Sequence, residues 1–118
     1  IEGSSVDNTV IKKVTKIAQN KKRIMVFLDS SHTHNHVLKE LELYSFFVTK
    51  GSYLVVFDTV VEDMPKGTVK NRPWDKGNNP KTAVWEFLKN NKSFVINQEI
   101  DNKLLITSAP NGFLKRVK

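Results

Sequence analysis

Apolar residues recur at three- and four-residue intervals in three segments of the chain, a spacing typical of amphipathic helices. The first segment is residues 7–20, and its apolar stripe is Val10, Val14 and Ile17. The second follows Ser30 or Ser31, either of which suits a helix cap, and ends at Lys50–Gly51; its stripe is Val37, Leu38, Leu41, Tyr44 and Val48. The third begins at Pro80, and its stripe is Val84, Phe87 and Leu88, with Trp85 beside it as an expected core residue.

Two continuous apolar runs, Ile24–Leu28 and Ser52–Phe57, separate these helices. Each is too short for a helix, and continuous apolarity is typical of strands covered on both faces. Two strands joined by a helix form a βαβ unit with parallel strands and a right-handed crossover. Further along, Phe94–Ile96 and Lys103–Thr107 flank the turn pair Asp101–Asn102. The pattern therefore predicts an α/β fold, with a mainly parallel sheet and an antiparallel C-terminal hairpin.

Prolines, glycines and asparagines interrupt the pattern over residues 59–79 and predict a long loop. A loop of this length in a compact domain is usually functional, so we expect it to be part of an active site. No glycine-rich turn joins a first strand to a first helix, and the opening residues IEGSS resemble the end of a strand. We therefore expect residues 1–118 to be the C-terminal half of a single, larger doubly wound domain, with its N-terminal part missing.

The composition excludes several classes of function. The formal net charge is +7, but the lysines are spread along the whole chain and no basic run is interleaved with aromatic residues, so we expect no nucleic-acid partner. No apolar run approaches the roughly 20 residues that a membrane-spanning helix needs. Cysteine is absent, which excludes disulfides, thiolate catalysis and cysteine-based zinc sites, and favours an intracellular, cytoplasmic location.

Two aspartates, Asp29 and Asp58, directly follow the predicted parallel strands. Neighbouring strands lie about 4.8 Å apart, so the two carboxylates are expected to converge at the carboxyl edge of the sheet, where α/β proteins bind ligands. Two carboxylates at that place are suited to one hard cation, Mg²⁺ or Ca²⁺. The alternative is that each aspartate caps a helix or ends a turn.

The only histidines of the chain, His32, His34 and His36, follow Asp29 closely. A histidine at the mouth of the strand-end crevice is suited to general base catalysis, because imidazole titrates near neutral pH. His32 lies nearest to the strand end and is the candidate base. His32 and His36 are also spaced to share one face of a helix, as a transition-metal pair does. The alternative for all three is an ordinary polar position at the start of the helix.

The long loop carries an aromatic and a cationic side chain within the segment NRPWDKGNN. We expect Trp74 to cover a bound substrate and Arg72 to hold an anionic or hydroxylated group on it. Packing within the loop is the alternative for Trp74. Glu62 and Asp63 are either exposed or additional metal ligands, and their position in the loop favours exposure.

Four segments of the chain, LDSSHTHNHVLKELELY, GSYLVVFDTVVEDMP, GNNPKTAVWEFL and KLLITSAPNGFLKR, resemble the cephalosporin hydroxylase family, which includes rhamnosyl O-methyltransferases. The resemblance covers nearly the whole chain. It implies the Rossmann-like class I methyltransferase fold, in which a seven-stranded sheet ends in an antiparallel strand. It also implies that S-adenosylmethionine is the cofactor, often together with Mg²⁺.

The chain is also similar, more distantly, to catechol-type O-methyltransferases, and this resemblance implies roles for particular residues. Asp29 takes the first metal position. Phe57 and Asp58 fall where those enzymes carry an acid–amide pair, so Asp58 remains a metal ligand, while Phe57 cannot ligate and weakens Mg²⁺ binding. His32 falls at the place of their catalytic lysine and is implied as the base. The adenine-contacting positions that the resemblance implies are Gly3, Ser4 and Ser5, with Asp29 beside the cofactor.

The function implied is an S-adenosylmethionine-dependent O-methyltransferase that acts on a hydroxyl of a sugar or small metabolite. Two alternatives stay open. One is a metal-dependent hydroxylase, in which Asp29 and two histidines form an iron-binding facial triad. The other is a catalytically degenerate binding domain or homo-oligomerisation partner, in which Phe57 replaces an acidic metal ligand and the metal is no longer bound.

Overall fold

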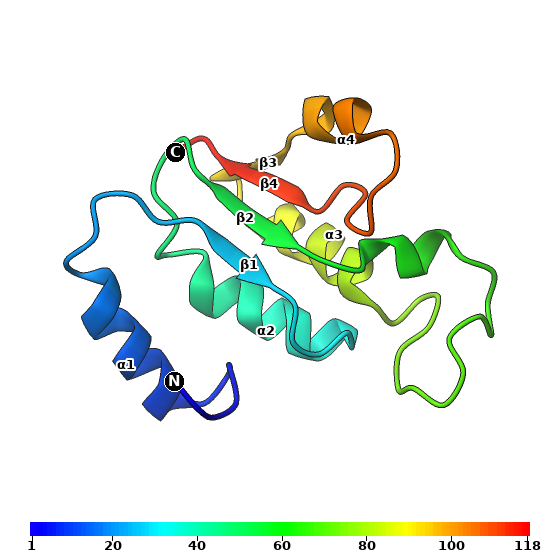
Figure 1. The fold of residues 1–118 in the computed structure, drawn as a ribbon, viewed down its shortest axis with the longest axis horizontal. Helices are drawn as coiled ribbons and strands as arrows, with labels where there is room; N and C mark the ends of the chain where they lie inside the picture. Colours follow the sequence, from blue (N-terminus) through cyan, green and yellow to red (C-terminus); the bar gives the residue numbers. More distant parts are fainter.

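The computed structural model describes residues 1–118, and its helices and strands alternate along the chain (Figure 1). In chain order they are α1 (Asn8–Ala18), β1 (Val26–Leu28), α2 (His34–Tyr44), β2 (Tyr53–Val56), the 3₁₀ helix η1 (Thr59–Asp63), α3 (Pro80–Asn90), β3 (Phe94–Ile96), α4 (Gln98–Leu104) and β4 (Phe113–Arg116). None of the helices has the length and apolar character that crossing a bilayer requires. The α/β class predicted from the sequence is confirmed.

The four strands form one mixed sheet in the order β1-β2-β4-β3. β1 and β2 are parallel, as the βαβ pattern predicts, and β4 runs antiparallel to both β2 and β3. The antiparallel pair at the C-terminal end is therefore present. It differs from a simple hairpin because α4 and a loop lie between its strands in the chain, and because the reversed strand lies inside the sheet rather than at its edge.

The prediction of a strand over Lys103–Thr107 is wrong. Helix α4 occupies the first part of this segment, because the Asn97 side chain accepts a hydrogen bond from the Glu99 backbone N–H and caps a helix there. Leu105 then adopts a positive φ of 62°, which ends the helix. Leu105 and Ile106 are 86% and 92% exposed, so this apolar run contributes nothing to the core.

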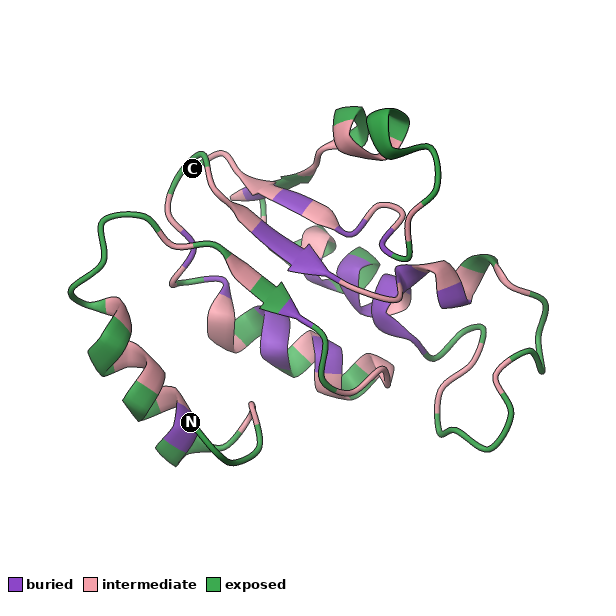
Figure 2. Ribbon diagram, viewed as in Figure 1, coloured by how far each residue is buried: buried purple, intermediate pink, exposed green.

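Helices α2 and α3 cover one face of the sheet, and the hydrophobic core lies between these layers (Figures 1 and 2). The strands alternate, so only every second side chain points into this core. Its buried members are Leu28, Val37, Leu41, Val48, Leu54, Val56, Ala83, Val84, Phe87, Phe94 and Leu114. The predicted stripes of the second and third helices supply five of the eleven, so the helical periodicity was informative. Trp85, an expected core residue, is instead 46% exposed.

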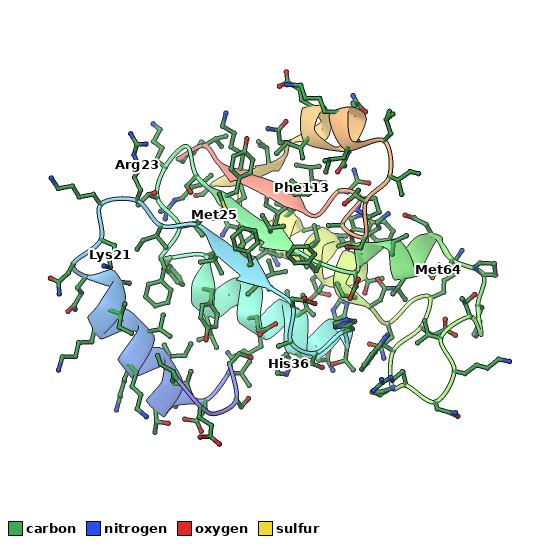
Figure 3. All side chains as sticks on the ribbon, viewed as in Figure 1. Lys21, Arg23, Met25, His36, Met64 and Phe113 are labelled. Atoms are coloured by element: carbon green, nitrogen blue, oxygen red, sulfur yellow. The ribbon has the colours of Figure 1, made fainter.

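The opposite face of the sheet is apolar and partly uncovered. Phe27, Val55 and Phe113 are cross-strand partners in one row, and Phe27 is 59% exposed. Figure 3 labels Met25, which directly precedes β1, and Phe113 on β4. The continuous apolar run of β1 predicted that both faces of this strand are covered, and this is wrong at Phe27. In β2, by contrast, Leu54, Val55 and Val56 are all buried.

The two ends of α2 are fixed by groups that differ from the predicted caps. The helix begins at His34, with Thr33 at the N-cap position and no side-chain capping bond, so neither Ser30 nor Ser31 caps it. Beyond its last turn, the Arg116 guanidinium donates hydrogen bonds to the backbone carbonyls of the segment that leads out of α2. Strand β4 thereby holds the far end of the helix against the sheet.

The predicted loop over residues 59–79 begins with η1 and is held in a defined shape by carboxylates. Glu62 Oε2 accepts hydrogen bonds from the Gly77 backbone N–H and from the side chain of Asn79, which caps α3. Asp75 Oδ2 accepts from the Gly67 backbone N–H at 2.7 Å and closes the loop across its base. The loop is thus anchored at both ends.

Glu62 and Asp63 differ in exposure. Asp63 is exposed, as expected, and pairs with the buried Lys81 at 2.5 Å. Glu62 is only half-exposed because it holds the start of α3. Both residues therefore anchor the loop.

We predict that the loop loses its closing contact only in strong acid. Backbone N–H groups of Gly67 and Lys76, which donate to the Asp75 carboxylate, lower the pKa of that carboxyl. The contact is therefore complete above the ordinary aspartate pKa of about 3.9 and is lost as the pH falls through the lowered value. An NMR titration of the Gly67 amide proton should show a midpoint below about 3.9. In Asp75→Asn the transition should be absent, and a wild-type midpoint at or above the ordinary value would contradict the prediction.

Candidate functional site

The carboxyl ends of β1 and β2 lie side by side because the two strands pair in parallel, with Leu28 opposite Val56. Asp29 follows β1 directly, and Asp58 follows β2 after one residue. The chain then turns sharply at Asp58, which has a left-handed φ of 54°. The ligating atoms of Asp29, His32 and Asp58 all lie within 4.8 Å of one another. The strand-end convergence predicted from the sequence is thus present, with His32 as its third member.

His32 and Asp58 form the closest contact of this cluster. The imidazole Nε2 lies 2.6 Å from Asp58 Oδ2, and the two side chains are 19% and 35% exposed. An imidazole N–H that donates to a carboxylate forms a charge-assisted hydrogen bond whether the ring is neutral or protonated. In both cases Asp58 fixes the orientation of the His32 ring. The sequence placed each residue near the site but did not predict that they are partners.

The long loop folds back over this pair. The Trp74 ring lies 4.8 Å from the His32 ring, measured between centroids, with 43° between the planes. The Arg72 guanidinium lies 5.4 Å from the centroid of the Trp74 ring, in cation–π geometry. Arg72 is exposed and Trp74 is half-buried. The loop therefore supplies one aromatic wall of the site, with a cation on its outer side.

The other two histidines have separate partners. His34 lies between α2 and α3, where its Nδ1 is 2.8 Å from Thr82 Oγ1 and its Nε2 is 3.1 Å from Glu86 Oε2. His36 Nε2 lies 3.1 Å from Ser5 Oγ. The predicted metal pair of His32 and His36 is wrong, because α2 begins only at His34 and the two rings have different partners. A facial triad with two histidines is likewise not assembled at Asp29.

Phe57 takes no part in the cluster. Its ring stacks on Phe27 at 6.1 Å, on the open side of the sheet. The donors that remain for a metal are two carboxylates and one imidazole. Mg²⁺ prefers an all-oxygen shell, whereas Mn²⁺ and Fe²⁺ accept mixed nitrogen and oxygen ligands. All three donors together suit a divalent transition cation, whereas Asp29 and Asp58 alone offer the oxygen ligands that Mg²⁺ takes.

A pocket of about 420 Å³ is lined in part by Ser30 and Ser31, the two residues between Asp29 and His32 that directly follow Asp29. Its lining residues are Ile1, Gly3, Ser4, Ser5, Val10, Val14, Ser30, Ser31, His36 and Tyr44. Gly3 has a φ of 134°, and a Cβ at this position would lie 2.8 Å from Val10 Cγ2, so only glycine fits there. The predicted cofactor residues Gly3, Ser4 and Ser5 are thus brought together with the loop after Asp29. Asp29 itself lies outside the lining.

Sequence reasoning missed Glu40 and Ser30 as site residues, which form one hydrogen-bond network with His36 and the predicted cofactor residue Ser5. Glu40 is 2% exposed in the middle of α2, and its Oε1 accepts a hydrogen bond from Ser30. A signal for it does exist in the sequence, since His36, Glu40 and Tyr44 recur every four residues on a helix whose neighbouring positions are apolar.

Comparison with known proteins gives one consistent result. The family model for rhamnosyl O-methyltransferase/CmcI matches residues 1–117. Proteins named rhamnosyl O-methyltransferase from Mycobacterium bovis (strain BCG / Pasteur 1173P2) and from Mycobacterium tuberculosis (strains H37Rv and H37Ra) are each 33% identical to the chain over 121 residues. No solved structure gives a significant match.

These alignments cover 98% of the chain but 46% of each mycobacterial protein, so the chain spans about half the length of the relatives it matches. The resemblance recognised in the four sequence segments is confirmed, and it extends over the strand-end cluster, the long loop and the pocket. The chain belongs to the rhamnosyl O-methyltransferase/CmcI family.

Proposed function

We propose that the whole protein is an S-adenosylmethionine-dependent O-methyltransferase that acts on a hydroxyl group of a sugar or small metabolite. The observation that carries the proposal is the His32–Asp58 pair, which lies under Trp74 and next to the pocket of Gly3, Ser5 and Ser30. The name of the mycobacterial relatives, rhamnosyl O-methyltransferase, supports the same reaction on a rhamnosyl group.

His32 is the proposed general base. With Nε2–H donated to Asp58, the neutral ring keeps its proton on that nitrogen, so Nδ1 is the atom that accepts the proton of the substrate hydroxyl. The imidazolium that forms is stabilised by the adjacent carboxylate, as in other acid–histidine pairs. Asp58 therefore acts by orienting and stabilising His32.

The loop residues are proposed to bind the acceptor. Trp74 offers an apolar ring face beside the base, against which the C–H groups of a sugar can pack. Arg72, exposed at the rim, has five N–H donors for hydroxyl oxygens. Because the loop is anchored by Glu62 and Asp75, it presents both side chains without having to be ordered first.

The pocket is proposed to hold the nucleoside end of the cofactor. When bound, S-adenosylmethionine supplies an activated methyl group. Ser5, Ser30 and Ser31 offer hydroxyl and backbone groups along one edge of the pocket, and Val10 and Val14 offer apolar contacts for a purine ring. Since residues 29–32 border both the pocket and the base, one short segment sets the distance between the cofactor and the substrate hydroxyl.

A divalent cation is proposed as an additional group at Asp29. His32 uses Oδ2 of Asp58, so Oδ1 of Asp58 and the Asp29 carboxylate remain as oxygen ligands. A cation held there would lower the pKa of the substrate hydroxyl. The side chain of Phe57 adds no ligand, so we expect weak binding.

We predict that replacing His32 by alanine lowers kcat by about 100-fold or more, because general base catalysis contributes roughly 10²–10⁴-fold. Asp58→Asn should lower kcat by a smaller factor, since His32 remains. Transfer of labelled methyl groups from S-adenosylmethionine to a rhamnoside measures both, with binding of S-adenosylhomocysteine by calorimetry as a second readout that neither variant should change.

Asn35→Ala is the matched control, because Asn35 is exposed on the same segment and lies outside the cluster. Its kcat should equal that of the wild type. Full activity in His32→Ala would show that His32 is not the base. A wild-type protein that binds neither S-adenosylmethionine nor its product would instead indicate a degenerate binding domain.

We further predict that the whole protein binds Mn²⁺ and that Asp29→Asn removes the binding, because the site then keeps a single carboxylate. Electron paramagnetic resonance of added Mn²⁺ measures the bound fraction directly. The exposed Glu99, a carboxylate outside the cluster, provides the control variant Glu99→Gln. Equal Mn²⁺ binding by wild type and Asp29→Asn would contradict a metal site at this place.

A further inference from the structure

Helix α2 carries a polar stripe on a surface that is otherwise part of the core. His36, Glu40 and Tyr44 are four residues apart and so share one face of the helix. The neighbouring Val37 and Leu41 are 2% and 0% exposed. Figure 3 labels His36 near the first turn of α2, below the end of β1. The stripe meets two other segments of the chain, the residues before α1 and the loop after β1.

Glu40 is the most buried member of the stripe, at 2% exposure. Its Oε1 accepts a hydrogen bond from Ser30 Oγ at 2.7 Å, and His36 Nε2 lies 3.6 Å from the same oxygen. Its Oε2 is buried and has no hydrogen-bond partner. Burying a carboxylate with one oxygen unpaired is unfavourable. A leucine would fill this place in a core helix more favourably, so packing does not account for the carboxylate.

His36 extends the network to the N-terminal segment. Its Nε2 lies 3.1 Å from Ser5 Oγ and 3.2 Å from Ser30 Oγ. Because Ser30 donates its proton to Glu40, the Ser30 oxygen is left to accept from His36. The neutral His36 ring therefore carries its proton on Nε2. Glu40 thus determines which way each hydrogen bond of the network runs.

Tyr44 completes the connection one helical turn further on. Its hydroxyl donates a hydrogen bond to the Ser5 backbone carbonyl at 2.8 Å. Burial and the negative charge of Glu40 both raise the pKa of Tyr44, so the phenol stays protonated and remains a donor. Ser5 is therefore held twice, by its side chain through His36 and by its backbone through Tyr44.

The two serines that the network fixes are 25 positions apart in the chain, and both line the pocket proposed for the nucleoside. His36 and Tyr44 line the same pocket, whereas Glu40 lies behind them and is not part of its surface. We propose that Glu40 is a positioning residue for the cofactor pocket, which holds Ser5 and Ser30 in the arrangement that binds the cofactor. The assignment of the cofactor as the ligand of this pocket rests on the proposed function.

The test compares Glu40→Leu, Glu40→Gln and wild type in the whole protein. In Glu40→Leu the KM for S-adenosylmethionine should rise by about tenfold, which corresponds to one lost hydrogen bond to a charged group. The kcat should stay within about twofold, because His32 and Asp58 are not part of the network. Glu40→Gln keeps one acceptor for Ser30 and should lie between the two. Glu42→Leu, at an exposed position of the same helix, should match the wild type.

A second variant keeps the test decisive if Glu40→Leu fails to fold. Ser30→Ala changes an exposed residue and breaks the same link, so it should raise KM by a similar factor. In the Glu40→Gln background, where part of the link is already lost, Ser30→Ala should raise KM by less than it does in the wild type. An unchanged KM in Ser30→Ala and Glu40→Gln overturns the proposal. A kcat that falls together with the melting temperature, at constant KM, overturns it as well, because Glu40 would then only stabilise the fold.

A ligand-free readout separates this proposal from the proposed function. Nitrogen-15 NMR of the imidazole rings should show neutral His36 with its proton on Nε2 in the wild type and a mixture of tautomers in Glu40→Leu. A wild-type protein that shows this tautomer but binds no S-adenosylmethionine would contradict the proposed function while supporting the role of Glu40. Equal tautomer populations in wild type and Glu40→Leu would contradict the role of Glu40 alone.

Discussion

The parallel pairing of β1 with β2 is the constraint on which the candidate site depends. Leu28 lies opposite Val56, so the chain leaves both strands at the same edge of the sheet, and Asp29, His32 and Asp58 meet there. A shift of one residue would turn Leu28 out of the core and move the acids apart. The core beneath the strands therefore fixes the distance between the reacting groups as well as the fold.

Much of this arrangement could be predicted from local patterns. The apolar stripes predicted α2 and α3, and the apolar runs predicted β1 and β2, because each pattern reflects burial against one neighbouring layer. The strand over Lys103–Thr107 was wrong because Asn97 starts a helix there, and a short apolar run does not distinguish a strand from an exposed turn. The exposure of Phe27 and Trp85 depends on which other layers of the fold cover them. A local sequence pattern does not carry this information.

The site was predicted in its parts but not in its connections. An acid at a strand end and a histidine three residues later are visible in the sequence, whereas the contact of His32 with Asp58 depends on the turn at Asp58 and on the pairing of two strands. The link from Glu40 to Ser5 joins residues 35 positions apart in the chain. It also requires a buried carboxylate, and acidic side chains are rarely buried in proteins. Both networks share the segment after β1, so the proposed base and the proposed cofactor pocket are set by one piece of chain.

The most direct test of this account is a crystal structure of the whole protein with S-adenosylhomocysteine bound. The account predicts that the nucleoside lies against Ser5 and Ser30 and that the sulfur faces His32 across a gap that one substrate hydroxyl can fill. A nucleoside bound elsewhere, or a sulfur that points away from the His32–Asp58 pair, would contradict it.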